Sequence, residues 1–284
     1  MPNDGINQIE EMTEFAAPNT DDAPLCNRET LLPAGIVRVT EEAIAAQRLV
    51  PENLQNLHGN APQRVTIAAF DFDGTCISGS SPKKLVDACA RARRIPPYKL
   101  LRIALWGLAY KLNLPKDGEG VRTRVFSAFK GLSAATTNDY LCKFYKNKIA
   151  PMYRTDADAA MHAHLQAGHV VVLVSASFEP IIAAAMLDHP IEFALASRMK
   201  IDEQGCYTDQ VNGLTTEGPD KIIVLEQFAN KYFGQGNWEL GWAYGDHFSD
   251  VAMLEAATHP CAVTPDGKLR RFAQQRGWEI LDWQ

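Results

Sequence analysis

Two aspartates one residue apart, Asp71 and Asp73, form the part of this sequence best suited to chemistry. They follow an uncharged apolar run, residues 65–70, which predicts a buried strand that ends in a glycine-containing turn. Like charges at this spacing raise each other's pKa unless a cation offsets them. Because a hard cation takes oxygen ligands, the pair predicts a Mg²⁺ site.

Such a pair could also act on phosphorus. A carboxylate beside Mg²⁺ can attack a phosphoryl group and form an acyl phosphate, as in aspartyl-phosphate enzymes. A second carboxylate can then protonate the leaving oxygen and later deprotonate water. The spacing of Asp71 and Asp73 is therefore compatible with hydrolysis of a phosphate ester.

An Asp-x-Asp-Gly segment is also common in turns and in calcium-binding loops. A calcium loop needs a third ligand two residues further on and a glutamate near its twelfth position. Those two places hold Thr75 and Pro82, which excludes a calcium loop. A plain turn stays open on these residues alone, so the rest of the chain has to decide.

Three later segments also present polar side chains at the start or end of a predicted element. A second apolar run ends at Ser175. Lys221 opens a segment with the apolar periodicity of a helix. A third apolar run leads into a loop that contains Asp246 and Asp250. Because ligands of parallel α/β sheets bind at the carboxyl ends of the strands, we expect these side chains to meet the aspartate pair there.

An aspartate pair, a strand-end serine, a lysine and a second acidic pair, in this order, resemble the four motifs of the haloacid dehalogenase superfamily of phosphatases. The resemblance runs from about residue 65 to the end of the sequence. It implies that Asp71 is the nucleophile and that Asp73 is the general acid and base. Relatives that dehalogenate carbon or pump ions lack an acid at the second position, so Asp73 favours phosphate ester hydrolysis.

The resemblance also implies roles for the other motif residues. The implied metal ligands are Asp71, Asp73, Asp246 and Asp250. They would hold Mg²⁺ directly, through a backbone carbonyl or through a water. The implied catalytic residues are Asp71, Asp73, Ser175 and Lys221. The implied phosphate-binding residues are Gly74, Thr75, Ser175, Ala176 and Lys221. Asp250 could alternatively orient Lys221 rather than hold a metal-bound water.

Each of the later motif residues also has a purely structural interpretation. Ser175 could cap a following helix, because serine is a favoured N-cap residue. Lys221 could be a solvated surface charge, and Asp250 could only balance the N-terminus of a helix. His247 could face either the substrate or the solvent.

The resemblance implies an α/β fold: a Rossmann-like three-layer core with a parallel sheet and a helical, C1-type cap inserted after the first strand. Residues 61–80 and 164–284 contain the predicted strands and form the core. Residues 81–163 have a helical pattern and form the cap, which would close over the site. Residues 1–60, which precede the first predicted strand, form an N-terminal extension that is expected to be partly disordered.

The cap resembles that of the phosphoserine-phosphatase-like branch, but the positions that read the substrate differ. Those enzymes have a glutamate nine residues after the nucleophile, and this chain has Ser80 at that position. They also have an arginine in the cap, and the nearest candidates here, Arg122 and Arg124, are out of register by a residue. We therefore expect a small phosphorylated metabolite, with phosphoserine as an alternative. Another alternative is a lipid phosphate at a membrane surface, as in phosphatidylglycerophosphatase-like enzymes, because residues 98–112 are nearly apolar with basic flanks.

The overall composition narrows the choice of partners and location. A net charge of −6 and a pI near 5.7 argue against a nucleic-acid-binding surface. The six cysteines have no paired spacing, which predicts reduced thiols. The acidic N-terminal segment has no apolar signal sequence. From these two observations we expect a cytoplasmic protein. A phosphate-binding scaffold that only kept the fold is a further alternative, but it would have no use for Asp73 as an acid.

Overall fold

The structure is a computed structural model. It describes residues 31–32, 36–38, 64–91, 129–213 and 216–284. The predicted apolar cap segment, residues 98–112, lies outside this part of the chain, as do Arg122 and Arg124. Among the described residues, no helix has the length and the apolar character that crossing a membrane requires.

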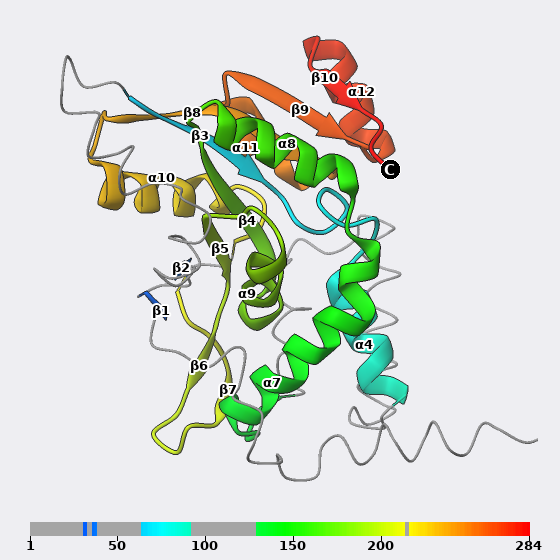
Figure 1. Ribbon diagram of the computed structural model, residues 1–284, viewed down its shortest axis with the longest axis vertical. Helices are drawn as coiled ribbons and strands as arrows, with labels where there is room; N and C mark the ends of the chain where they lie inside the picture. Colours follow the sequence, from blue (N-terminus) through cyan, green and yellow to red (C-terminus); the bar gives the residue numbers. More distant parts are fainter. Residues whose placement is uncertain (1–30, 33–35, 39–63, 92–128, 214–215) are drawn as a thin grey trace, which may run out of the picture.

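A sheet of eight strands forms the centre of the described structure (Figure 1). Its six core strands are parallel, and their spatial order is β5 (Phe193–Ser197), β4 (Val170–Phe178), β3 (Val65–Phe70), β8 (Trp238–Gly245), β9 (His259–Val263) and β10 (Glu279–Leu281). β3 therefore has hydrogen-bonded neighbours on both sides. It is uncharged and four of its residues are buried, as expected of a strand covered on both faces. The predicted α/β class with a parallel sheet is confirmed.

Two short strands from the N-terminal extension complete the sheet. β1 (Leu31–Leu32) pairs antiparallel with β2 (Ile36–Arg38), and β2 pairs antiparallel with β5. The prediction that residues 1–60 precede the first strand is wrong for these two segments. Strands of two and three residues are too short to show the alternating pattern by which strands are recognised in a sequence.

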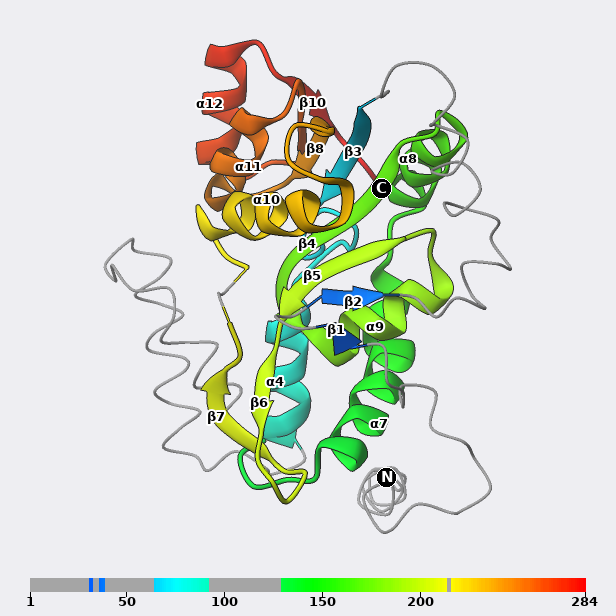
Figure 2. The ribbon, with the colours of Figure 1, turned by 90° about the vertical axis from the view of Figure 1, so that its left-hand side faces the viewer.

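Helices cover both faces of the sheet (Figure 2). Alternate residues of β3 point to opposite faces, so that Ala68 and Phe70 belong to one buried cluster and Ile67 and Ala69 to another. The first cluster includes residues of α8 (Thr155–Gln166) and α9 (Glu179–Asp188). The second includes residues of α10 (Asp220–Phe233), α11 (Val251–Ala256) and α12 (Gly267–Arg276). The predicted three-layer core is confirmed.

The described residues between β3 and β4 are mostly helical, as predicted for the insertion after the first parallel strand. They form α4 (Ser81–Arg91), α7 (Ala134–Phe144), the π-helix η2 (Tyr145–Ile149), the 3₁₀-helix η3 (Ala150–Met152) and α8. The expected boundary between cap and core at residue 163 falls inside α8. A hairpin of β6 (Met199–Ile201) and β7 (Tyr207–Val211) supports this region, because the Tyr207 N–H donates to Leu132 O at 2.9 Å.

The cysteines differ in part from the prediction of reduced thiols. Cys76, Cys206 and Cys261 are free thiols. Cys142, on α7, is disulfide-bonded, so the prediction is wrong at this position. Spacing along the chain could not reveal this bond, because a disulfide depends on which cysteines the fold brings together.

A cluster of histidine and aromatic side chains holds α8 on the sheet. His164 of α8 is buried, with Nδ1 2.9 Å from His169 Nδ1 and Nε2 2.9 Å from the Tyr244 hydroxyl. The His169 ring stacks on Trp242 of β8. Burial lowers the pKa of His164 to about 4, and the neighbouring His169 adds to this effect. The His164 ring is therefore neutral in the folded protein at pH 7.

Acid should destabilise the protein through His164. The unfolded imidazole takes up a proton near its ordinary pKa of about 6.5, whereas the folded one does so only near pH 4. The free energy of unfolding should therefore fall as the pH drops from 7 to 4, by up to about 3 kcal/mol from this residue. Urea unfolding of wild type and His164→Gln at several pH values would measure this difference.

The matched control is His162→Gln, which replaces an exposed histidine on the same helix. Only the His164 variant should lose part of the acid dependence. Equal dependence on pH in the two variants would contradict the role of the buried ring.

Candidate active site

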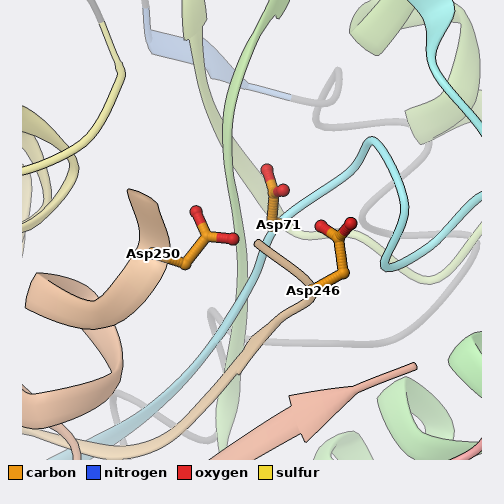
Figure 3. Close-up of side chains that lie close together, drawn as sticks. All are labelled: Asp71, Asp246 and Asp250. Atoms are coloured by element: carbon orange, nitrogen blue, oxygen red, sulfur yellow. The ribbon is translucent and has the colours of Figure 1, made fainter. Parts of the chain in front are cut away.

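Three carboxylates converge where β3 and β8 end (Figure 3). Asp71 follows β3, and its backbone N–H donates to Tyr244 O at 2.9 Å, so the two strand ends lie side by side. Asp246 follows β8, and Asp250 is the last residue of the short 3₁₀-helix η4 (Phe248–Asp250). One oxygen from each of the three carboxylates lies within 4.8 Å of the others. The structure thus brings three of the four predicted metal ligands together.

A buried ammonium joins two of these carboxylates. Lys221, the second residue of α10, is only 3% exposed. Its Nζ lies 2.7 Å from one oxygen of Asp71 and 2.7 Å from one oxygen of Asp250. The interpretation of Lys221 as a solvated surface charge is therefore wrong. Asp250 is fully buried and orients this lysine, so it does more than balance a helix N-terminus.

Burial makes negative charge costly at this site. It raises the pKa of Asp71 to about 7, against the opposing attraction of Lys221. Burial, together with Asp71 and Asp250, raises the pKa of Asp246 to about 8. Burial opposes the charged form of Lys221, but Asp250 and Asp71 outweigh it and raise the pKa of the ammonium above its usual value. One ammonium among three carboxylates leaves a negative centre that a further cation would neutralise.

The loop after Asp71 is shaped around Asp246. Gly74 has a φ of +84°, and a Cβ at this position would come 2.0 Å from Oδ2 of Asp246, so a side chain does not fit. Thr75 is buried, and its hydroxyl donates to Oδ1 of the same carboxylate at 3.4 Å. The three carboxylates supply only oxygen donors, which suit Mg²⁺ better than a softer metal. The residues present therefore fit the predicted ion.

The side chain of Asp73 lies outside this group of three carboxylates. One of its oxygens accepts from the backbone N–H of Ser81, and the other accepts from the hydroxyls of Ser81 and Ser177. Ser81 is the first residue of α4, Ser177 belongs to β4, and their hydroxyl oxygens are 2.7 Å apart. The predicted acid and base is thus held between the cap and the core. Sequence reasoning missed both serines, because no spacing relates them to Asp73.

Ser175 and Ala176 line the cavity beside the aspartates. β4 continues through both residues to Phe178, and its pairing with β5 is irregular between Ser175 and Phe178. Phe178 is the N-cap of α9 and makes no capping hydrogen bond with its side chain. The interpretation of Ser175 as a mere helix cap is therefore wrong. Its hydroxyl oxygen instead accepts from the Ser177 N–H at 3.0 Å.

A cavity of about 720 Å³ joins these residues. The predicted site residues that line it are Asp71, Asp73, Gly74, Ser175, Ala176, Lys221, Asp246 and Asp250. It is also lined by Lys83 and Lys84 of α4 and by Met152 of η3, none of which was predicted as a site residue. His247 lines it too, as the N-cap residue of η4, where its Nδ1 accepts from the Ser249 N–H. The cavity places cap residues opposite the ends of the core strands.

Comparison with known proteins agrees with the motifs. The model of the haloacid dehalogenase-like hydrolase family matches residues 68–255. A Streptomyces azureus protein named inhibition of morphological differentiation protein is 28% identical over 222 residues, 77% of this chain and 78% of that protein. A Mycobacterium tuberculosis protein named phosphoserine phosphatase is 28% identical over 229 residues, 78% of this chain and 73% of that protein.

A solved structure extends this likeness to the fold. A protein of unknown function from Bordetella pertussis superimposes with a TM-score of 0.70 and 25% identity, and the match covers 77% of this chain and 99% of that one. The match therefore includes most of this chain and nearly all of that one.

The buried lysine should be essential for stability. Removing one partner of a buried ion pair leaves uncompensated charge and typically costs about 3–5 kcal/mol. Lys221→Met should therefore lower the free energy of unfolding by this amount at pH 8. The loss should be smaller at pH 5.5. Burial already raises the pKa of Asp71 to about 7 against the attraction of Lys221, so without the lysine this carboxylate would be protonated and neutral at that pH.

The control is Lys130→Met, which breaks the exposed pair between Lys130 and Asp209. An exposed pair contributes about 0–1 kcal/mol. Denaturant unfolding of both variants would compare the two losses, and similar small losses would contradict the structural role of Lys221.

Proposed function

This chain belongs to the haloacid dehalogenase-like hydrolase family, and on that premise we propose that it is a Mg²⁺-dependent phosphomonoesterase that works through an aspartyl phosphate. The observation that carries the proposal is the position of Asp71. Its carboxylate faces a cavity, lies 2.7 Å from the Lys221 ammonium and shares its surroundings with Asp246. A nucleophile, a fixed positive charge and a set of oxygen ligands are thus next to one another.

Asp71 and Asp246 are the residues that would hold the metal ion, with Asp73 contributing its backbone carbonyl and Asp250 acting through a water or through Lys221. The bound ion would neutralise the carboxylates and the phosphoryl oxygens, so that the two could approach. The raised pKa of Asp71 and of Asp246 supports this assignment, because burial disfavours the two negative charges by more than the attraction of Lys221 offsets.

The reaction would proceed in two steps. An oxygen of Asp71 attacks phosphorus, the bond to the ester oxygen breaks, and Asp73 gives that oxygen its proton. Asp73 then takes a proton from a water that attacks the same phosphorus, and the bond to Asp71 breaks to release inorganic phosphate. Lys221, the Ser175 hydroxyl and the Ala176 amide would hold the phosphoryl oxygens in place. Such positioning and charge neutralisation are most of what phosphoryl transfer requires.

We infer that the substrate is a small phosphorylated metabolite. Polar and basic residues line one side of the site, among them Ser80, just before α4, and Lys83 and Lys84 of α4. A relative is named a phosphoserine phosphatase, which supports phosphoserine as the alternative, although Ser80 stands where those enzymes carry a glutamate. A lipid phosphate stays a weaker alternative, because it depends on residues 98–112 outside the described structure. The cytoplasmic location likewise stays a prediction.

Turnover should depend on both Asp71 and Mg²⁺. An amide at position 71 cannot form the acyl phosphate, so Asp71→Asn should lose p-nitrophenyl phosphatase activity while it keeps its fold. Phosphate release by the wild type should stop after chelation with EDTA and return with Mg²⁺. Asp188→Asn, which changes an exposed aspartate on α9, is the control and should keep full activity. Substantial turnover by folded Asp71→Asn would refute the mechanism.

The acid role of Asp73 should appear as a dependence on the leaving group. Asp73→Asn should slow hydrolysis of an alkyl phosphate by about 10²–10⁴-fold. It should slow that of p-nitrophenyl phosphate much less, because nitrophenolate leaves without a proton. Phosphoenzyme should accumulate in this variant, since Asp73 also activates the water, and acid quenching with labelled substrate would detect it. Equal slowing of both substrates without trapped phosphoenzyme would argue against the assignment.

A further inference from the structure

Arg154 connects the nucleophile loop with a distant segment of the chain. It lies between η3 and α8, and its backbone N–H donates to Cys76 O at 2.8 Å. One terminal nitrogen of its guanidinium donates to Gly74 O at 3.4 Å, and the other donates to Trp283 O. Arg154 does not line the cavity, so it acts on the site only through these backbone groups.

The contact with Gly74 bears directly on a predicted metal ligand. The backbone of Gly74 lies against the Asp246 carboxylate so closely that a Cβ would clash with it. The next residue, Thr75, donates its hydroxyl to that same carboxylate. A shift of the peptide between these two residues would therefore move the surface on which Asp246 rests.

The contact with Trp283 reaches Asp246 from the other side. Trp283 O also accepts from the Thr264 hydroxyl at 3.4 Å, and the Trp283 ring stacks on Tyr244. Thr264 has a φ of +40°, which is unusual for a β-branched residue, and it begins the turn in which the Asp266 N–H donates to Asp246 O at 2.8 Å. Of the two carbonyls that Arg154 bridges, Gly74 O thus belongs to the loop that lies against the Asp246 carboxylate, and Trp283 O accepts from the first residue of the turn that binds the Asp246 backbone.

We propose that Arg154 is a positioning residue that holds Asp246 in its place by fixing the Gly74 and Trp283 carbonyls relative to each other. The inference rests on the proposed function, because it assigns Asp246 to the metal site. A guanidinium has donors in a fixed fork and can bridge two acceptors, whereas a lysine ammonium is a single point. The Nε of Arg154 is buried and has no hydrogen-bond partner in the described structure. The side chain is therefore positioned so that its two terminal nitrogens bridge the two carbonyls, although this leaves the Nε donor unsatisfied.

The test compares Arg154→Met with Arg270→Met. Arg270 also holds the segment that contains Trp283, since its guanidinium donates to Asp282 at 3.0 Å. Its backbone N–H donates to Asp266 O, but this bond does not depend on the side chain that the substitution removes. A displacement of about 1 Å in a catalytic group can cost roughly 10²-fold in rate. Arg154→Met should therefore lower kcat by about 10²-fold and raise the Mg²⁺ concentration needed for half activation, with little change in KM. Arg270→Met should leave all three unchanged.

Arg154→Lys separates the fork from the charge and is the variant to use if Arg154→Met does not fold. It should keep most of the melting temperature but show the same fall in kcat and the same weaker Mg²⁺ activation. Free guanidinium at sub-denaturing concentration should restore part of kcat in Arg154→Ala and none in Arg270→Met. Wild-type kcat and Mg²⁺ activation in folded Arg154→Lys, or absence of guanidinium rescue, would overturn the proposal.

A second readout separates this proposal from the proposed function. Mg²⁺ should raise the melting temperature of the wild type and of Arg270→Met, and should raise that of Arg154→Met much less. If the wild type hydrolyses no phosphate ester but this difference is seen, the phosphatase assignment fails and the positioning role stands. If Mg²⁺ raises all three melting temperatures equally, the positioning role fails whatever the activity.

Discussion

The ion pair of Lys221 with Asp71 and Asp250 is the constraint on which the site depends. Desolvating one ammonium and two carboxylates is expensive, and the protein offsets this cost only where the three groups are in direct contact. The contact requires that α10 begin at the end of β3 and that η4 begin at the end of β8. A lysine on a surface helix could tolerate a shift of several ångströms, but this one cannot. The packing of α10 on the sheet therefore determines the geometry of Asp71, the proposed nucleophile.

The parallel sheet supplies this precision. Phe70 is in register with Leu173 on one side and with Tyr244 on the other, so β3 and β8 end close together, while β4 continues past them through Ser175. Asp71, Ser175 and Asp246 are the first polar residues past or near those ends. The helices α8 and α9 on one face and α10 to α12 on the other exclude water from the strands but leave the edge open. The cap elements α4 and η3 then cover another side of the site. Ser81 of α4 donates to Asp73, and Met152 of η3 lines the cavity.

Much of this arrangement could be predicted from the sequence because it follows from local patterns. Uncharged apolar runs followed by acids or a serine indicate buried strands with polar ends, and the rule that such ends meet at one edge of a parallel sheet brought Asp71, Ser175 and Asp246 together. The order of the motifs also indicated the family. The helices α4 and α7 lie where a helical insertion was expected.

What could not be predicted depends on contacts between distant segments that leave no periodic signal. The hydroxyls of Ser81 and Ser177 reach the same oxygen of Asp73 from two elements that are distant in the sequence, α4 and β4, and neither serine differs in its local sequence from an ordinary cap or strand residue. Arg154 looks like any charged residue before a helix, since only the fold shows that its guanidinium faces two carbonyls. The strands β1 and β2 and the disulfide of Cys142 were missed for the same reason.

The central position of β3 has a consequence for synthesis on the ribosome. The nascent chain makes β3 early, but one of the two strands that flank it, β8, belongs to the last third of the sequence. Until that part emerges, the edge of β3 that will pair with β8 has no partner from its own chain, and such edges are prone to pair with other molecules. The proposed site residues also come from both sides of this interval, since Asp71 follows β3 and Asp246 follows β8. The site can therefore form only after β8 has been made, and until then the free edge of β3 has to be kept from pairing with other chains.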